Sequence, residues 1–342
     1  MSTVQDVSTA PVVAAVPKKD MALGPLASLI ILALLIVTPL FVKNFIIFQM
    51  TMWLIYAIAV LALNILTGAS GQFSLGQSAF YALGAYTSAI LMEHVGVNYA
   101  LTLPVAGLVC FIAGFLFGLP ALRLSGIYLA LATFALAVAM PQLLKLGVFE
   151  HWTGGVQGLV VTKPDAPEIL ASLGLKVSQD MWLYFFTLAV TILIYILSVN
   201  LLKSRSGRAM MAIRDNEIAA SAMGVDVSLY KTLAFGVSAG ITGVAGGLGA
   251  IAVQFVAPDG YTIQLAIALF LGMVVGGVGW LPGSLAGAAF IVFVPNIAEH
   301  VSKGLSGAVF GVILIIIIFL LPNGARQLAY LAQGLIGKLR KH

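Results

Sequence analysis

Long apolar runs recur along this chain and are separated by short polar or glycine-containing segments. Each run approaches the roughly 20 residues that an α-helix needs to cross the hydrocarbon core of a bilayer. Several runs are short or interrupted by glycine, so we expect some helices to be tilted or re-entrant. The pattern predicts an all-α polytopic membrane protein with about ten transmembrane helices, near residues 21–42, 46–66, 77–92, 99–119, 125–145, 181–202, 232–256, 264–280, 284–299 and 307–322.

The polar segments predict the organisation around these helices. Residues 1–20 are polar and contain proline, which predicts a disordered tail. The first apolar run is too long for a signal-peptide core and no small-residue cleavage site follows it, so we expect it to be retained as a helix. The chain then divides into a transmembrane domain over 21–325, with longer loops at 146–180 and 203–231, and a basic tail over 326–342.

The basic residues orient the predicted helices. With ten crossings and a cytoplasmic N-terminus, the segments inside the cell carry twelve of the 17 lysines and arginines, and the outer segments carry five. Seven of the twelve acidic residues fall outside. This bias follows the positive-inside rule. Both termini and the 203–231 loop are therefore predicted to be cytoplasmic, and the 146–180 loop to be periplasmic.

Composition excludes several classes of protein. Hydrophobic residues make up 61% of the 342 residues and charged residues only 8%, whereas about a quarter of residues are charged in soluble domains. The spans leave no length for a soluble ATPase or Rossmann domain. The net charge of +5 comes with no basic stripe interleaved with aromatic residues, so we expect no nucleic-acid partner. The single cysteine, Cys110, can form no intrachain disulfide.

The predicted helices carry no ionisable group near their centres. Lys43, Arg123, Lys145 and Glu299 lie at helix ends, where their charges can reach the membrane interface. A transporter driven by an ion gradient usually needs an ionisable group near the bilayer midplane. Any uphill transport by this chain must therefore be powered by another protein.

No catalytic or metal site is expected. The four histidines show no i, i+4 pair and no cysteine partner. The motif Gly-Ala-Ser-Gly at residues 68–71 is similar to that of rhomboid-type intramembrane serine proteases. The histidine nearest a later helix is His300, which the topology places on the opposite face, about 30 Å from Ser70. A general base must lie within hydrogen-bond reach of its nucleophile, so the protease is a minor alternative.

One uncharged segment interrupts two apolar runs. Residues 67–77 read TGASGQFSLGQ. Glycine permits non-helical backbone, and amide and hydroxyl groups are neutral partners for a polar solute. Such breaks often line the substrate path of a transporter, although a tight turn with capping side chains is the competing interpretation. The candidate path residues are Ser70, Gln72, Ser74 and Gln77.

The 203–231 loop contains a predicted short helix. Asp215 or Asn216 is suited to its N-cap, Glu217 to the positive helix end, and Gly224 to the position just after the helix. These signals bound about two turns with small residues on the surface. Small side chains let another protein approach closely, whereas a solvated surface helix is the competing interpretation.

Four ordered stretches resemble one family. They are 71–80 (GQFSLGQSAF), 122–130 (LRLSGIYLA), 153–155 (TGG) and 207–224. From about residue 50 to residue 325 the chain is similar to the M-type permease subunit of branched-chain amino-acid ABC importers. The last stretch resembles the coupling loop Glu-Ala-Ala-x-x-x-Gly of importer permeases, but Ile218 occupies the glutamate position and Glu217 is displaced by one residue.

The resemblance implies a non-catalytic permease subunit in a bacterial inner membrane. Its implied partners are a second, H-type permease, two cytoplasmic ATP-binding subunits, a periplasmic solute-binding protein and membrane lipid. ATP is bound by the partners, so no cofactor is expected in this chain. In such importers the short helix of the loop seats in a groove of an ATPase. The implied coupling residues are Gly207, Arg208, Arg214, Asp215, Glu217, Ala219, Ala220 and Gly224.

Further expectations follow for the solute and the packing. The implied solute is Leu, Ile or Val, with urea, an amide or an aromatic acid as alternatives within the same importer group. A passive channel, which would need neither nucleotide nor docking partners, is the alternative outside it.

The outer loop is long enough to meet a binding protein, with Trp152-Thr153-Gly154-Gly155 as the candidate contact or a simple exposed turn. Glycine-rich helices near 239–250 and 272–289 predict close helix packing.

Overall fold

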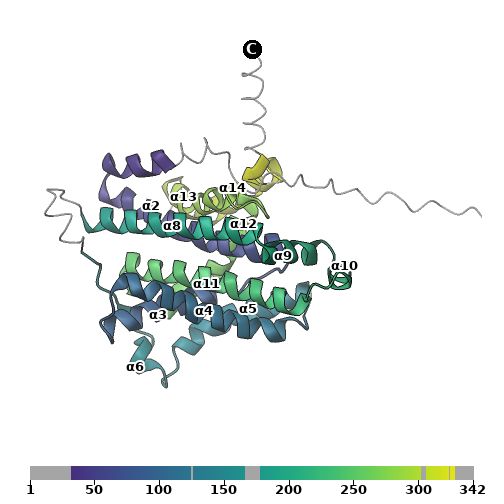
Figure 1. Ribbon diagram of the computed structural model, residues 1–342. Helices are drawn as coiled ribbons and strands as arrows, with labels where there is room; N and C mark the ends of the chain where they lie inside the picture. The colour runs from purple at the N-terminus through teal and green to yellow at the C-terminus, as the bar shows by residue number, and fades with distance from the viewer. Residues whose placement is uncertain (1–31, 125, 166–177, 302–305, 323, 328–342) are drawn as a thin grey trace, which may run out of the picture.

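The computed structural model describes residues 32–124, 126–165, 178–301, 306–322 and 324–327, which form a bundle of helices running in roughly one direction (Figure 1). Two strands of two residues each, β1 (Leu159–Val160) and β2 (Phe255–Val256), pair antiparallel. The helices are η1 (Thr38–Leu40), α2 (Asn44–Leu63), the π-helix η2 (Asn64–Ala69), α3 (Gln77–Glu93), α4 (Tyr99–Ala121), α5 (Ile127–Leu144), α6 (Glu150–Thr153), α8 (Gln179–Lys203), α9 (Arg205–Asp215), α10 (Glu217–Ala222), α11 (Val227–Val253), η3 (Pro258–Tyr261), α12 (Ile263–Gly276), α13 (Gly283–Val301) and α14 (Ser306–Leu320).

The predicted helical architecture is confirmed over most of its length. Nine of the ten apolar runs coincide with helices. Residues 21–31 of the first run, 21–42, lie outside the described residues, as do most or all residues of the two predicted tails. Two shorter helices, 283–299 and 307–317, are also apolar. The chain is therefore an all-α polytopic membrane protein, whereas ten crossings and cytoplasmic termini stay predictions. Six described helices are long and apolar enough to span a bilayer: Asn44–Ala69, Tyr99–Ala121, Ile127–Leu144, Gln179–Lys203, Val227–Val253 and Pro258–Gly276.

Glycine brings the central helices into backbone contact. α11 packs against α2, α3 and α4. A Cβ added at Gly84 of α3 would lie 2.1 Å from the carbonyl oxygen of Gly243 in α11, and one at Gly246 would lie 2.0 Å from that of Tyr81. α12 and α13 meet in the same way at Gly272 and Gly287. Small residues let helix backbones approach this closely, so the predicted packing role of both glycine-rich stretches is confirmed.

α3 begins inside the bundle rather than at its end. Its first residue, Gln77, accepts a hydrogen bond from Thr242 Oγ1 at 2.7 Å and donates one to Ser238 Oγ at 2.9 Å. Both partners lie in the middle of the 27-residue α11. The non-helical residues 71–76 therefore enter the bundle, where irregular backbone is tolerated because protein covers it.

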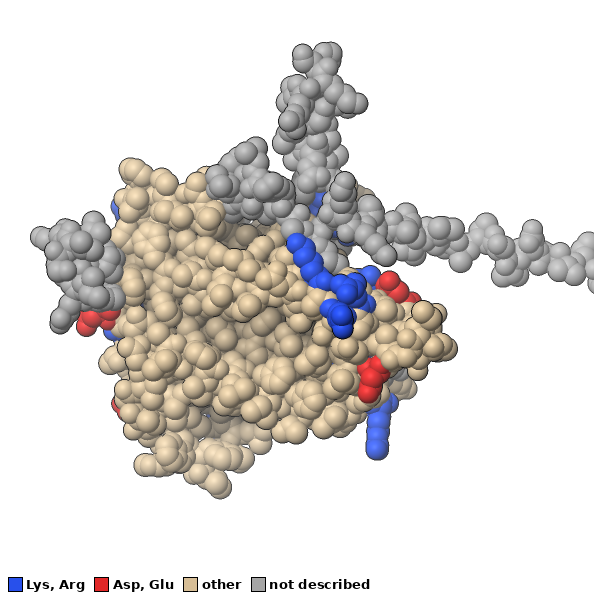
Figure 2. Space-filling model, viewed as in Figure 1, with Lys and Arg blue, Asp and Glu red and all other residues tan. Residues whose placement is uncertain are grey.

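The connecting segments gather at two opposite ends of the bundle. Figure 1 shows α9 and α10 at one end, which we call the inner end, and α6 at the other, which we call the outer end. The described 203–231 loop lies at the inner end, where its Arg214 contacts Gly68. Lysine and arginine side chains gather over that end in Figure 2. The cytoplasmic placement of this end stays a prediction.

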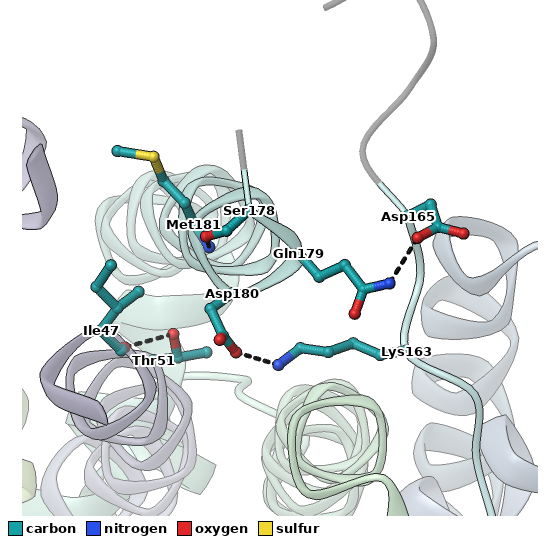
Figure 3. Close-up of polar contacts among 8 residues, drawn as sticks. All are labelled: Ile47, Thr51, Lys163, Asp165, Ser178, Gln179, Asp180 and Met181. Carbon is teal, nitrogen blue, oxygen red and sulfur yellow. Dashed lines mark hydrogen bonds and ion pairs between the residues drawn. The ribbon is translucent and has the colours of Figure 1, made fainter. Parts of the chain in front are cut away.

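The segments predicted to be periplasmic meet at the outer end. Lys145 at the end of α5 pairs with Asp259 of η3. Lys163 pairs with Asp180, and Gln179 donates to Asp165, so the chain before 166–177 is fastened to the start of α8 (Figure 3). Residues 166–177 of the predicted periplasmic loop lie outside the described part of the chain.

Candidate functional site

A glycine sets the corner between α8 and α9 at the inner end. Ser204 caps both helices, and its hydroxyl accepts a hydrogen bond from the Gly207 amide at 3.4 Å. A Cβ at Gly207 would lie 2.4 Å from the carbonyl oxygen of Leu201. No side chain fits between these backbones, so Gly207 is required where α9 leaves the bundle.

The predicted short helix of the coupling loop is α10. Asn216, rather than Asp215, is its N-cap, and Asn216 Oδ1 accepts from the Ala219 amide at 3.0 Å. At the other end the Gly224 amide donates to Ser221 at 2.9 Å and the Val225 amide donates to Ala220 at 3.0 Å. These are the two hydrogen bonds of a Schellman motif, and Gly224 has the positive φ, 82°, that the motif requires.

α10 presents two apolar side chains beside small ones. Ile218 is 83% exposed and Met223 is 84% exposed, whereas Ala220 is buried. Figure 1 shows α10 extending beyond the ends of the membrane helices. Two exposed apolar side chains on such a projection are suited to insertion into a groove of another protein. We call this the α10 surface; it consists of Ile218, Ala219, Ser221, Ala222 and Met223.

Sequence reasoning did not select Ile218 and Met223 as docking residues. It assigned docking to small and charged residues of the loop. The signal was available, because two large apolar residues flank small ones within an otherwise polar loop. Only the caps show that both residues belong to one short, outward-facing helix.

The charged residues of this loop are bonded within the chain. Arg208 Nη1 donates to the Lys203 carbonyl at 2.8 Å. Glu217 pairs with Lys231 at the start of α11. Arg214 points inward, with Nη1 donating to the Gly68 carbonyl at 2.7 Å and Nη2 donating to Asp215 Oδ1 at 2.8 Å. These residues therefore anchor α9 and α10 to the bundle.

A buried asparagine joins this anchor to the turn between α12 and α13. Asn64 is 1% exposed and lies at the start of η2, in which all six residues are buried. Its Nδ2 donates to the carbonyls of Gly277 at 3.2 Å and Trp280 at 3.1 Å. Its Oδ1 accepts from the Gly279 amide at 2.7 Å. One side chain thus holds three backbone groups of the 277–280 turn.

The four candidate path residues are buried, and each of them is hydrogen-bonded within the chain. Ser70 Oγ donates to the Leu66 carbonyl at 2.6 Å. Gln72 Nε2 donates to Ser70 Oγ and to the Lys231 carbonyl, both at 3.0 Å. Ser74 Oγ accepts from the Gly76 amide at 3.2 Å. Together with Gln77, whose partners are on α11, they hold the non-helical segment in place, and direct contact with solute stays a prediction.

The geometry does not support a protease site. The Ser70 hydroxyl is already bonded to a backbone carbonyl. α13 begins at Gly283, next to the turn that Asn64 holds, and His300 follows 17 residues later, which corresponds to about 26 Å of helical rise. Among the described residues, no group of three metal-ligating side chains could hold an ion.

Two histidines that are far apart in sequence meet at the outer end. The rings of His94 and His151 lie 6.0 Å apart, and the ring of Trp152 lies 5.4 Å from that of His94. The sequence shows no i, i+4 pair among the histidines, and this contact was not predicted from it. They meet because the segment after α3 and the segment around α6 share the outer end.

Comparisons with known proteins place the sequence in a family. The family described as "Branched-chain amino acid transport system / permease component" matches residues 45–318. The high-affinity branched-chain amino acid transport system permease protein LivM of Salmonella typhimurium strain LT2 is 36% identical over 67% of this chain, and that of Escherichia coli K12 is 35% identical over the same share. The probable permease protein LivH of Methanocaldococcus jannaschii is 27% identical over 63% of this chain and 68% of its own length.

The match to the two LivM proteins spans 58% of their own length. No solved structure matches this chain.

Proposed function

This chain belongs to the family of permease components of branched-chain amino acid transport systems, and from that premise we propose that it is the membrane subunit of an ATP-driven importer. The subunit moves Leu, Ile or Val inward across a bacterial inner membrane by alternating access. Its partners are a second, H-type permease, two cytoplasmic ATP-binding subunits and a periplasmic solute-binding protein. ATP is hydrolysed by the partners, and this chain supplies the path and the docking helix.

The observation that carries this proposal is the α10 surface. A capped helix ends in a Schellman motif and presents Ile218 and Met223 almost fully to solvent at the inner end. Transferring such a side chain from water into an apolar groove contributes about 1.5–3 kcal/mol. Two exposed apolar side chains of this kind are therefore expected to be buried by a protein partner rather than to stay in water.

The membrane helices support the same conclusion through their chemistry. The buried polar side chains of the described spans are uncharged, as in Asn64, Ser238 and Thr242. A carboxylate that could bind a coupling ion at mid-depth is missing from those described spans. The energy for uphill transport is therefore expected to enter through the α10 surface.

The test of the docking role is a charge placed on the α10 surface. Met223→Asp should reduce recovery of the ATP-binding subunits by about tenfold in a detergent pull-down, because an ionised carboxylate cannot enter an apolar groove without a large desolvation cost. The matched control is Val148→Asp, since Val148 is also 84% exposed but lies in the outer segment after α5. Equal recovery with both variants would remove the docking role.

The test of the transport activity is uptake into proteoliposomes that contain the full assembly. ATP inside and the binding protein outside should both be required for accumulation of labelled leucine. Urea, short amides and aromatic acids serve as competitors for the solute. Accumulation driven by an ion gradient without ATP would contradict the proposal.

A further inference from the structure

Three segments from distant parts of the sequence converge on Gly68. Arg214 of α9 donates to its carbonyl at 2.7 Å. A Cβ at Gly68 would lie 2.5 Å from Asn64 Oδ1 and 2.6 Å from the Gly279 amide nitrogen. Helix η2, the end of α9 and the turn between α12 and α13 are therefore in direct contact at one glycine.

The segment between these contacts is a π-helix. η2 extends α2 over residues 64–69 with the wider i to i+5 hydrogen-bond pattern. π-helical turns are rare and differ from the α-helix by one residue in a turn, so they offer an alternative arrangement of the same backbone. In η2 the carbonyls of Leu66 and Gly68 accept side-chain hydrogen bonds from Ser70 and Arg214. A segment of this kind is able to change shape when one of its side-chain partners moves.

α10 is connected to residues 68–72 through two neighbouring helices, α9 and α11. Asn216 ends α9 and caps α10, so the two helices share a residue, and Arg214 connects α9 to Gly68. On the other side, Lys231 pairs with Glu217 of α10 through its ammonium and accepts from Gln72 through its backbone carbonyl. A displacement of α10 therefore acts on both ends of residues 68–72.

We propose that Arg214 and Asn64 are positioning residues that transmit displacement of the docked α10 through η2 to the α12–α13 pair. This proposal rests on the proposed function, because the displacement is supplied by the ATP-binding subunits. Arg214 transfers the movement of α9 to Gly68, and Asn64 transfers it to the three backbone groups of the 277–280 turn.

The α12–α13 pair is built to move as one body. A Cβ at Gly276 would lie 2.2 Å from the Gly283 carbonyl, and one at Gly287 would lie 1.9 Å from the Gly272 carbonyl. At its outer end, α12 follows directly after η3. η3 carries Asp259, which pairs with Lys145 of α5, and Tyr261, whose ring lies 5.9 Å from that of Tyr81. A push at the inner turn therefore reaches contacts at the outer end.

The link is tested by removing each polar group at nearly constant volume. Arg214→Met keeps the aliphatic stem that packs on Gly71 but loses the guanidinium, and Asn64→Leu loses both amide functions. In the full assembly in proteoliposomes, we expect ATP-binding subunits to be retained, ATP hydrolysis to continue, and leucine taken up per ATP hydrolysed to fall about tenfold in each variant. Arg214→Lys should restore part of the loss.

Matched controls separate the link from general damage. Arg205→Met removes the same charge from the same helix, and Arg205 is exposed. Asn296→Leu removes an amide whose hydrogen bond stays within α13. Both should keep uptake per ATP near the wild-type value. Because Arg214 and Asn64 act in series, the double variant should take up as much leucine per ATP hydrolysed as the more impaired of the two single variants. Unchanged coupling in both single variants, or losses that multiply in the double variant, would overturn the link.

A second measurement does not depend on transport. Spin labels at Val278→Cys and Tyr128→Cys report the position of the α12–α13 turn relative to α5, and both native side chains are exposed. Adding ATP to the assembly should change this distance in the wild-type background and leave it unchanged with Arg214→Met. An equal change in both would contradict the proposal. If instead the wild-type assembly shows no ATP-dependent uptake, the proposed function fails and not the link alone.

Discussion

Gly224 combines a required backbone conformation with open surroundings. Its φ is 82°, and a Cβ added there would meet no atom within 4 Å. Any effect of substitution must therefore come from the backbone and not from a clash. At the residue scale this separates Gly224 from Gly207, where a side chain has no room at all.

Gly224→Val should uncouple ATP hydrolysis from uptake. A left-handed conformation costs an ordinary L-residue about 1–2 kcal/mol, and a β-branched residue tolerates it worst. The strain should loosen the end of α10 and shift Met223. Gly224→Asn is the matched control, since asparagine adopts this conformation readily. The measurement is the ratio of leucine uptake to ATP hydrolysis in the same proteoliposomes. An equal ratio in the two variants would count against the prediction.

Gln77→Leu should lower stability. The substitution removes the acceptor of the Thr242 hydroxyl, and an orphaned polar group in the interior costs about 1–3 kcal/mol. Ser238 loses the amide that donates to it but keeps its own hydrogen bond to the Ala62 carbonyl. Thermal unfolding in detergent should show a lower midpoint than for Gln142→Leu, whose native side chain is exposed on α5. If Gln77 instead contacts solute, the variant would keep its midpoint and change the concentration dependence of uptake.

Among the helices, α11 depends most on the absence of side chains. Its glycines meet the backbones of α3 and α4 directly. Gly246→Ala would place a methyl group 2.0 Å from the Tyr81 carbonyl, so α3 and α11 would have to separate. We expect a marked loss of folded protein in size-exclusion chromatography. Gly311→Ala on α14 is the control, because its added Cβ meets nothing within 4 Å; a similar loss in both variants would refute the packing argument.

The helices themselves were largely predictable from the sequence, but the level within the bundle at which a helix begins was not. The runs that became α4, α8 and α11 were found because an apolar run of spanning length is a local property. The caps of α10 were predicted for the same reason, with Asp215 or Asn216 as the N-cap and Gly224 after the helix, because caps act on neighbouring residues. The starting depth of α3 escaped prediction because it depends on Gln77 meeting Ser238 and Thr242, more than 150 residues away in sequence.

The same limit applies to Arg214. In the sequence it stands just before α10, yet its guanidinium bonds to Gly68, which is 146 residues away. No local pattern announces that contact. Asn64 was visible as a lone amide in an apolar helix, but its partners at 277–280 belong to a different part of the chain.

At the scale of the whole molecule, the two ends of the bundle predict a labelling pattern. Cys110 is fully buried, so single-cysteine variants can be read without interference. Val160→Cys, 68% exposed in the native chain, should react with a membrane-impermeant maleimide only from outside the cell. Ser221→Cys on α10 should react only from inside. The reverse pattern would invert the orientation, and labelling of both from one side would contradict the opposite placement of these segments.

The glycine contacts also determine where the protein is able to deform. α3, α4 and α11 touch through their backbones, and so do α12 and α13, so the helices of each group have little room to slide past one another. α2 packs against both groups and ends in the π-helix. Transport by this fold should therefore proceed by rotation of two rigid groups, α3–α4–α11 and α12–α13, about the shared helix α2. Substitutions that make α2 or its π-helical end more flexible should alter the rate of the transport cycle more than substitutions within either group.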